Sequence, residues 1–306
     1  MGIFLGIDGG GSKTSCEIGT ENTVLGRGFG AGSNVVRVGE DQARTSFQNA
    51  IREACEEAKV SPSQISRACV GIAGGARPET TEIIRKIVTD VVPGEIEVVG
   101  DMVIAIEAAS GSGPGVVVIA GTGSIAYGRN AAGQTARAGG WGFAISDEGS
   151  GHWIGRRAVN AAMRAYDEGQ SAPLLEEAVK AWGVSSREQM ILVANTSPPP
   201  DFAGLFPVVV RASEAGDPLA SEILIQSGAE LSRLAEIVID RLFQGAESVP
   251  VAMSGGVFSN SAQVRQVFYN NLRSRHPGVA LNATIVDPVK GALELARKAA
   301  RRGAGA

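Results

Sequence analysis

Two short glycine-rich segments hold the residues best suited to bind an anion. The first, DGGGSKT, spans residues 8–14, and the second, GTGS, spans residues 121–124. Glycine lets a ligand approach the backbone closely, so that N–H groups and small hydroxyls in such a turn can bind phosphate oxygens. The two segments therefore predict phosphate binding at two places in the chain.

Each glycine segment joins two predicted strands and not a strand to a helix. FLGI at 4–7 and SCEI at 15–18 flank the first segment, and VVVIA at 116–120 and IAYGR at 125–129 flank the second. Walker A and dinucleotide-binding loops instead open directly into a helix, and Ser12 stands where Walker A needs a glycine. The pattern predicts two phosphate-binding β-hairpins.

The repeated hairpin predicts an internal duplication. A third strand follows each hairpin, near 24–28 and 135–138, and a chain of 306 residues exceeds one ordinary hydrophobic core. We expect one domain at 1–115, with 286–306 returning to it, and a second at 116–285. Facing hairpins would hold one triphosphate from both sides of an interdomain cleft.

Strands that alternate with amphipathic helices predict an α/β fold. A loop is expected over 197–200, where three prolines follow one another. Helices are predicted at 40–59, 78–91, 151–168, 173–182, 218–244, 261–274 and 288–301, and further strands at 68–73, 95–99 and 250–253.

Composition argues against several classes of partner. With 28 basic and 32 acidic residues the net charge is -4, which gives no long-range attraction to nucleic acid or to an anionic membrane. The amino terminus lacks a basic leader, and no apolar run approaches the roughly 18–20 residues of a membrane span. We expect a soluble, cytoplasmic protein with no nucleic-acid or membrane partner.

Cysteine and histidine are too sparse for several kinds of site. Cys16, Cys55 and Cys69 lie far apart with no CxxC pair, which predicts buried free thiols and not a metal site. The only histidines are His152 and His276, and neither lies beside a G-x-S-x-G motif. This argues against a Ser-His-Asp hydrolase.

Asp101 is the residue best placed to act as a general base. It follows a strand predicted to be buried and precedes a helix, at the carboxyl end of a strand, where α/β proteins bind ligands. A carboxylate there can orient an acceptor hydroxyl and take its proton during phosphoryl transfer. The alternative is a helix N-cap, and the two roles are compatible.

The order of the motifs resembles one family over nearly the whole chain. DGGGSKT, GTGS, GGWG at 139–142 and DEGS at 147–150 resemble the N-acetylglucosamine kinase branch of the actin, hsp70 and sugar-kinase superfamily, and also the BadF/BadG ATPase family. The resemblance implies duplicated ribonuclease H-like (actin-like ATPase) domains that use ATP and Mg²⁺.

The resemblance also implies roles for residues of the two hairpins. Asp8 would organise magnesium and its waters, or alternatively only close a turn. Lys13 would pair with phosphate or simply solvate the loop. The predicted cofactor-binding residues are Gly10, Gly11, Ser12, Lys13, Thr122, Ala203, Gly256 and Asn260, the last three beside adenosine.

The implied acceptor site lies mainly in the segment after the second hairpin. The predicted substrate-binding residues are Asn34, Asp101, Gly123, Ser124, Gly140, Trp141, Gly142, Asp147 and Gly151. Asp147 would accept hydrogen bonds from sugar hydroxyls, or alternatively act as a plain loop or cap residue. Trp141 is expected to be a packing anchor, with stacking on the sugar as the alternative.

The resemblance implies an ATP-dependent kinase that converts an amino sugar, N-acetylglucosamine first, to its 6-phosphate. Glucosamine and N-acetylmuramic acid are alternatives, because Val36 stands where the animal enzymes carry tryptophan. Arg37 would meet the carboxylate of a muramic acid or face solvent. The family also leads us to expect a homodimer.

Two functions of other classes stay open. The BadF family includes ATP-driven activators of radical dehydratases, which hold an iron–sulfur cluster between subunits through paired cysteines. The positions of Cys16, Cys55 and Cys69 match no such pairing. A non-catalytic sugar sensor is the other alternative, although Asp101 and both glycine turns are retained.

Overall fold

The computed structural model describes residues 2–74, 77–196 and 199–303. The chain divides into two compact units. The first unit holds 1–117, 128–134 and 286–306, and the second holds 118–127 and 135–285. Residues 116–117 and 128–134 thus lie in the first unit, whereas the sequence pattern assigns them to the second domain.

Two five-stranded sheets share one strand order. The orders are β3-β2-β1-β4-β5 and β10-β9-β6-β7-β8, so in each sheet the first strand is central, the next two lie on one side and the last two on the other. The predicted duplication and α/β class are confirmed. The strands are β1 Ile3–Gly9, β2 Lys13–Gly19, β3 Val24–Ala31, β4 Ile65–Ile72, β5 Glu95–Gly100, β6 Gly115–Ala120, β7 Ser124–Arg129, β8 Thr135–Gly139, β9 Val249–Ser254 and β10 Val279–Val286.

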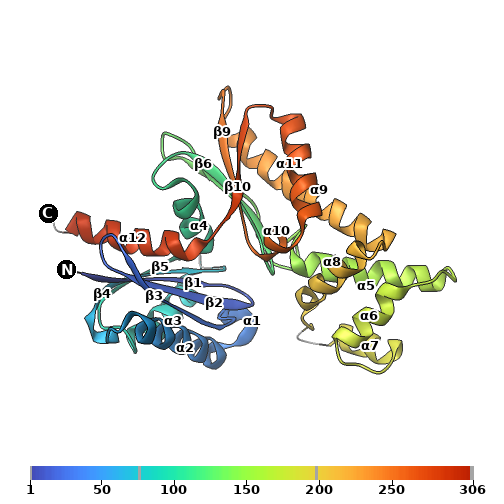
Figure 1. Cartoon of the computed structure of the whole chain (residues 1–306), viewed down its shortest axis with the longest axis horizontal. Coiled ribbons are helices and arrows are strands. Elements are labelled where there is room, and N and C mark those ends of the chain that lie inside the picture. The colour runs from blue at the N-terminus through green and yellow to red at the C-terminus, as the bar shows by residue number, and fades with distance from the viewer. Residues whose placement is uncertain (1, 75–76, 197–198, 304–306) are drawn as a thin grey trace. The chain divides into compact units, whose positions relative to one another are not determined.

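Helices cover both faces of the first sheet (Figure 1). Alternate residues of β1 point to opposite faces, so that Leu5 and Ile7 join the core under α2 and α3, whereas Phe4 packs with α4 and α12. The helices of this unit are α1 Val35–Val38, α2 Glu40–Ala58, the 3₁₀ turn η1 Pro62–Gln64, α3 Pro78–Thr89, α4 Asp101–Ser110 and α12 Pro288–Gly303.

Strand β3 lies directly against the backbone of α2. A Cβ atom added to Gly28 would stand 2.1 Å from the carbonyl oxygen of Ala50, and Gly26 and Gly30 make similarly close approaches. The edge of this strand is also covered, because Arg27 N donates to Glu57 (2.6 Å) and Phe29 N donates to Glu53 (2.8 Å). The alternating glycines therefore bring α2 close enough to bind the edge of the sheet.

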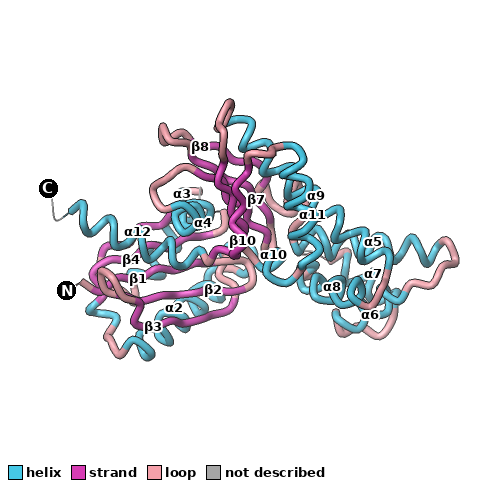
Figure 2. Tube along the Cα trace, turned by 45° about the horizontal axis from the view of Figure 1, so that its top comes forward, coloured by secondary structure: helices cyan, strands magenta, loops and turns pink. Residues whose placement is uncertain are grey.

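Long helices pack against one another in the second unit, where α9 and α11 run side by side (Figure 2). Gly155 on α5 lets that helix touch the 3₁₀ turn η2, since an added Cβ would lie 1.9 Å from the carbonyl oxygen of Phe202. The helices are α5 Gly151–Asp167, α6 Pro173–Ala181, α7 Arg187–Ala194, η2 Phe202–Leu205, α8 Phe206–Glu214, α9 Pro218–Leu242, α10 Gly256–Asn260 and α11 Ala262–Arg275.

The predicted helices and strands are present, with ends that differ by at most a few residues. The structure adds β10, α7, α8, the short helices α1 and α10 and the 3₁₀ turns η1 and η2, which the sequence pattern did not indicate. Residues 197–198 of the predicted loop lie outside the described residues.

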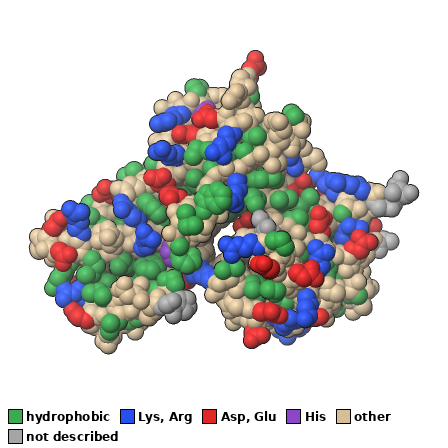
Figure 3. All heavy atoms as spheres, turned by 180° about the vertical axis from the view of Figure 1, so that it is seen from behind, with side chains coloured by type: hydrophobic (Ala, Val, Ile, Leu, Met, Phe, Trp, Pro, Cys, Tyr) green, Lys and Arg blue, Asp and Glu red, His purple; other side chains and the backbone are tan. Residues whose placement is uncertain are grey.

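Acidic and basic side chains alternate over the face shown in Figure 3, in keeping with the small net charge. Among the helices that the structure describes, none has the length and apolar character needed to cross a bilayer. The three cysteines are free and buried, as predicted.

Candidate active site

The first hairpin is a tight turn between β1 and β2. Gly10 N donates to the carbonyl oxygen of Lys13 (3.0 Å), and β2 follows the turn directly. The prediction that this segment does not open into a helix is confirmed. A Cβ on Gly32 would lie 2.3 Å from the carbonyl oxygen of Gly11, and Thr14 Oγ1 lies 2.7 Å from Ser33 Oγ. The residues after β3 are therefore held against the hairpin.

Asp8 lies at the carboxyl end of β1, opposite Ser15 of β2 and Gly71 of β4. The pKa of its carboxyl is raised to about 7, first by burial and then by the charges of Asp101 and Asp287, against a smaller lowering by Lys13. A carboxylate that burial and like charges destabilise in this way is stabilised by a cation. The site fits the predicted magnesium role of Asp8, which stays a prediction.

Asp101 is the first residue of α4, and its Oδ1 accepts a hydrogen bond from Met102 N (2.8 Å). Gly100 occupies the N-cap position, so the N-cap alternative is wrong. The preceding strand β5 is a half-buried edge strand and not a buried one. Its carboxyl end still meets that of β1 at one edge of the sheet, because β4 is parallel to both. The start of α4 also favours negative charge.

Asp287 is a residue of this unit that the sequence analysis missed. It directly precedes Pro288, the first residue of α12, and its charge acts on Asp8. An aspartate followed by proline is a common signal for the start of a helix, and this signal could have drawn attention to it.

Asn34 caps the short helix α1. Its Oδ1 accepts a hydrogen bond from Val36 N (3.1 Å), and Ser33 N donates to the carbonyl oxygen of Gly10 (3.1 Å). The neighbouring Val36 is 70% exposed, and Arg37 is exposed. Asn34 therefore directly follows Ser33, which is bonded to the first hairpin, but its side-chain oxygen already accepts a hydrogen bond within α1.

The second hairpin is bonded to the loop that follows β8. Gly121 N donates to the carbonyl oxygen of Gly123 (2.9 Å) within the turn. Ser124 N donates to Asp147 Oδ1 (3.2 Å), and Ser124 Oγ donates to the carbonyl oxygen of Glu148 (2.7 Å). The predicted acceptor loop, residues 140–150 between β8 and α5, and the second phosphate turn therefore form one hydrogen-bonded structure.

Asp147 is held in an unusual backbone conformation. Its φ is +69°, which is rare for a residue other than glycine, and it is 8% exposed. Burial raises the pKa of its carboxyl, while the hydrogen bond from Ser124 N lowers it. The N-cap of α5 is Ser150, so Asp147 is not the cap residue. Strain and burial at one carboxylate favour a functional reading of this position.

Glycines shape the acceptor loop and its contact with η2. Gly140 and Gly142 have φ of +70° and +94°. A Cβ on Gly151 would lie 3.2 Å from the carbonyl oxygen of Gly121 and 3.5 Å from Ala203 Cβ. The structure therefore brings the second hairpin, the start of α5 and one predicted adenosine residue together.

Trp141 is 60% exposed, so the expected packing anchor is wrong. The Arg137 guanidinium lies over its ring, 3.8 Å from the centroid. The indole is contacted on one face by a cation and is more than half exposed.

The other adenosine-side residues follow β9. A Cβ on Gly255 would lie 2.4 Å from the carbonyl oxygen of Ala120, so this turn contacts the start of the second hairpin. Asn260 Nδ2 donates to the carbonyl oxygen of Gly256 (2.8 Å). Asn260 thus supports its own helix, and Gly256 is the better candidate for a base contact.

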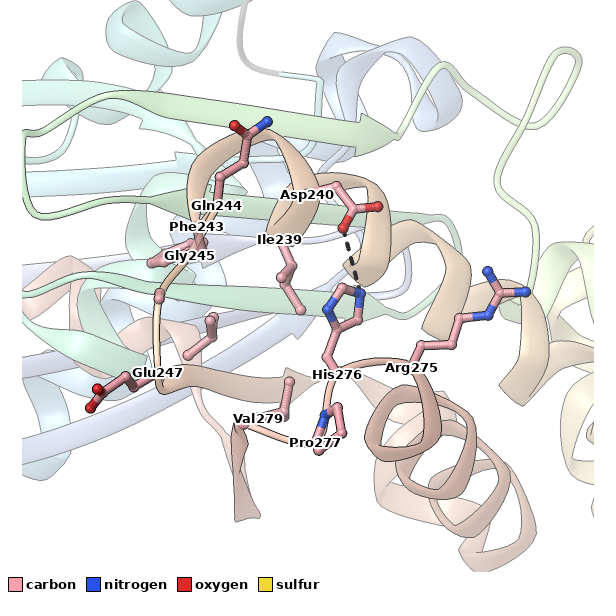
Figure 4. A pocket seen from close by; sticks show the side chains of 13 residues that line it. Ile239, Asp240, Phe243, Gln244, Gly245, Glu247, Arg275, His276, Pro277 and Val279 are labelled. Carbon is pink, nitrogen blue, oxygen red and sulfur yellow. Dashed lines mark ion pairs between the residues drawn. The ribbon is translucent and has the colours of Figure 1, made fainter.

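A pocket of 490 Å³ lies elsewhere in the second unit, between the end of α9 and the start of β10 (Figure 4). His276 Nε2 and Asp240 Oδ1 approach to 3.7 Å at its wall. None of the predicted site residues lines it. Pocket size is therefore a poorer guide to the active site of this protein than the hydrogen bonds at the two hairpins.

Comparison with known proteins places the chain in a family. The BadF/BadG/BcrA/BcrD ATPase family model matches residues 5–296. The chain belongs to this family. The chain is similar to an N-acetylmuramic acid/N-acetylglucosamine kinase from Clostridium acetobutylicum, with 33% identity over 97% of this chain and 99% of that protein. It is also similar to an N-acetyl-D-glucosamine kinase from Dictyostelium discoideum, with 28% identity over 96% of this chain and 97% of that protein.

A solved structure shares the fold of this BadF/BadG/BcrA/BcrD family member. The structure, described as that of an N-acetylglucosamine kinase candidate from Chromobacterium violaceum, superposes with a TM-score of 0.77 at 24% identity. The match covers 96% of this chain and 99% of that one. The duplicated α/β architecture is therefore shared over the full length of both chains.

Proposed function

We propose that this protein transfers the γ-phosphoryl group of ATP to the 6-hydroxyl of N-acetylglucosamine. The observation that carries the proposal is the placement of Asp8 and Asp101 at the same end of the first sheet, at the carboxyl ends of strands β1 and β5 that both run parallel to β4, where the charge of Asp101 acts on Asp8. It supports a general base and a phosphate-binding hairpin that act at the same edge of the first sheet. The two kinase relatives support the same reaction class and amino-sugar acceptors.

Magnesium and ATP fit the residues of the first unit. The pKa of Asp8 is raised by burial and, to a smaller extent, by the negative charges of Asp101 and Asp287, and a divalent cation would offset both effects. Magnesium bound to a nucleotide needs only one or two protein carboxylates, since phosphates and water supply the other ligands. Asp8 would hold the ion, whose charge would offset that of the transferred phosphoryl group. Gly10, Gly11 and Ser12 would hold phosphate oxygens through the turn.

Asp101 would hold the acceptor hydroxyl and take its proton. The start of α4 favours the ionised carboxylate, which must accept that proton as the new P–O bond forms. Phosphoryl transfer depends mainly on positioning and charge stabilisation, so one carboxylate is sufficient for the proton transfer.

The second unit would bind the sugar and part of the nucleotide. Asp147 would accept hydrogen bonds from sugar hydroxyls, while Gly123 and Ser124 continue the turn that binds it. Thr122 would contact phosphate, and Ala203, Gly256 and Asn260 would lie beside adenosine. Such a reaction, with ATP as the donor, is consistent with a cytoplasmic enzyme.

Release of ADP in the presence of separate sugars tests the proposal. We expect turnover with N-acetylglucosamine, and weaker or no turnover with glucosamine and N-acetylmuramic acid. Asp101→Asn should lower kcat by about 100- to 10,000-fold with little change in sugar KM. Asp41→Asn is the matched control, because Asp41 is also in the first turn of a helix. Absence of turnover with all three sugars would contradict the proposal.

The cysteines bear on the dehydratase-activator alternative. Cys16, Cys55 and Cys69 are 0–4% exposed in the first unit. Thiols buried in this way are poorly suited to bind a cluster shared between subunits. The variant Asp101→Asn also separates an enzyme from a sugar sensor, because a sensor would bind sugar equally well without turnover in either form.

A further inference from the structure

A row of four aromatic rings runs through the second unit. His152 stacks 5.1 Å from Phe143 and 5.3 Å from Phe202, measured between ring centroids, and Phe202 lies 5.1 Å from Trp182. Contacts between aromatic rings at these distances and tilted angles are favourable beyond the area that they bury. His152 is the ring that connects Phe143 on one side to Phe202 and Trp182 on the other.

The two neighbours of His152 come from different parts of the proposed site. Phe143 lies in the acceptor loop between Gly142 and Asp147, whereas Phe202 opens η2 and directly precedes Ala203. Phe143 is 48% exposed, and Phe202 is 7% exposed. The histidine ring therefore connects a partly exposed sugar-side ring to a fixed nucleotide-side ring.

The backbone of His152 is fixed to the second hairpin. Its N–H donates to the carbonyl oxygen of Thr122 (3.2 Å), and the N–H of Gly151 donates to that of Gly121 (2.8 Å). The residue is 8% exposed and stands in the first turn of α5. A shift of the phosphate turn must therefore move this ring, and with it the ring of Phe143.

We propose that His152 is a positioning residue that couples the acceptor loop to the nucleotide-binding segments through its ring contacts. Sugar binding that orders Phe143 then favours the arrangement of the second hairpin that binds nucleotide, and nucleotide binding favours sugar binding by the same factor. The inference rests on the proposed kinase function, but it adds a residue and a linkage that the reaction itself does not require.

The coupling is measured by titration calorimetry. The Kd of N-acetylglucosamine is determined with and without a non-hydrolysable ATP analogue and Mg²⁺, and the ratio of the two Kd values is the coupling factor. We expect His152→Ala to reduce this factor by about fivefold or more, because the central ring is lost. His152→Phe keeps the ring and should retain the factor within about twofold.

Two further variants separate coupling from folding. Tyr166→Ala removes a ring contact with Arg187 at the other end of α5 and should leave the coupling factor unchanged. Phe143→Leu alters the partly exposed end of the row and should reduce the factor even if His152→Ala does not fold. Equal coupling in folded wild-type, Phe143→Leu and His152→Ala proteins would overturn the inference.

The outcomes also distinguish this inference from the proposed function. An active wild-type enzyme whose coupling survives in His152→Ala contradicts the role of His152 alone. If His152→Phe loses as much coupling as His152→Ala, the ring contacts do not carry it and the inference is wrong. If the wild-type protein phosphorylates no amino sugar, the proposed function is wrong, and the inference that rests on it is wrong as well.

Discussion

The two hairpins have the same place in their sheets but different partners. The first has Asp8 at the end of its leading strand, and the charges of Asp101 and Asp287 act on that carboxyl. The second has Ala120 directly before its GTGS motif, where the first has Asp8 before GGGS, and takes its carboxylate from the acceptor loop, through the hydrogen bond from Ser124 N to Asp147. Duplication preserved the turn, while the acidic residues diverged.

The difference suggests a division of work between the repeats. The first hairpin is suited to the metal and the proton transfer, because Asp8 on β1 and Asp101 after β5 lie at the same end of the sheet, with β4 between the two strands. The second is suited to link phosphate with sugar, because its turn is bonded to the acceptor loop. Variants placed at matching positions of the two hairpins test this interpretation.

Among the changes that compare the two hairpins, the largest effect is expected at Asp8. Asp8→Asn should lower kcat by about 100- to 1,000-fold, since it removes the carboxylate that would hold the metal ion, whose charge stabilises the phosphates. The matching change in the second hairpin, Ala120→Ser, should have little effect. The measurement is kcat as a function of Mg²⁺ concentration, and binding of Mg²⁺–ADP followed by thermal shift provides a second readout. A normal magnesium dependence in Asp8→Asn would break the comparison.

Asp147 should be the next most sensitive position. Asp147→Asn preserves an acceptor for Ser124 N and tolerates the positive φ, but removes the charge. We expect sugar kcat/KM to fall by about 10- to 100-fold while the KM for ATP changes little. Glu148→Gln is the control, because the bond at Glu148 from Ser124 Oγ goes to the backbone. An unchanged sugar kcat/KM would contradict the sugar-binding role.

Two glycine substitutions compare how tightly the hairpins are packed. Gly32→Ala places a Cβ 2.3 Å from the backbone of the first hairpin, whereas Gly151→Ala places one 3.2 Å from the second. The first change should destabilise the protein by about 1–3 kcal/mol and raise the KM for ATP, and the second should do less. Denaturant unfolding and ATP titrations measure both effects. The reverse ranking would show that the second turn is the more tightly constrained.

The smallest effect concerns Glu17, which lies on β2 next to the first hairpin and pairs with Arg27 at 2.8 Å. Burial raises the pKa of its carboxyl from 4.5. The folded state therefore holds the proton more tightly, and stability falls as pH rises from that value through the folded pKa. Glu17→Gln should melt a few degrees higher than wild type near pH 8 and at the same temperature near pH 4. If Glu17→Gln melted at a lower temperature than wild type near pH 8, the prediction would be wrong.

The sequence predicted the parts of the fold that have strong local signals. Both hairpins were recognisable because glycine turns stand between apolar strands, and α2 and α9 because their apolar residues recur at helical spacing. Strand β10 was not, because Asn282 and Thr284 interrupt its apolar pattern and it lies at the edge of its sheet. The short helix α7 buries only Met190 and leaves little periodicity to detect.

The sequence predicted which residues belong to the candidate site, but not which of them contact one another. The bond from Ser124 N to Asp147 joins residues 23 apart in sequence, and the effect of Asp287 on Asp8 spans almost the whole chain. No local pattern reports such proximity, which depends on how the strands are ordered. The exposure of Trp141 was also misjudged, because residue type alone favours burial of a large ring, whereas here the ring is 60% exposed and contacts the Arg137 guanidinium.

The glutamates that cover β3 affect how copies of the chain can meet. The N–H groups of Arg27 and Phe29 would otherwise be available to a strand from another molecule, as in fibril growth or domain swapping. With both donors bound by Glu57 and Glu53, an incoming strand must displace two carboxylates and the helix that carries them. The predicted homodimer, if it forms, should therefore use a surface other than this sheet edge, and a concentrated solution should resist aggregation through it.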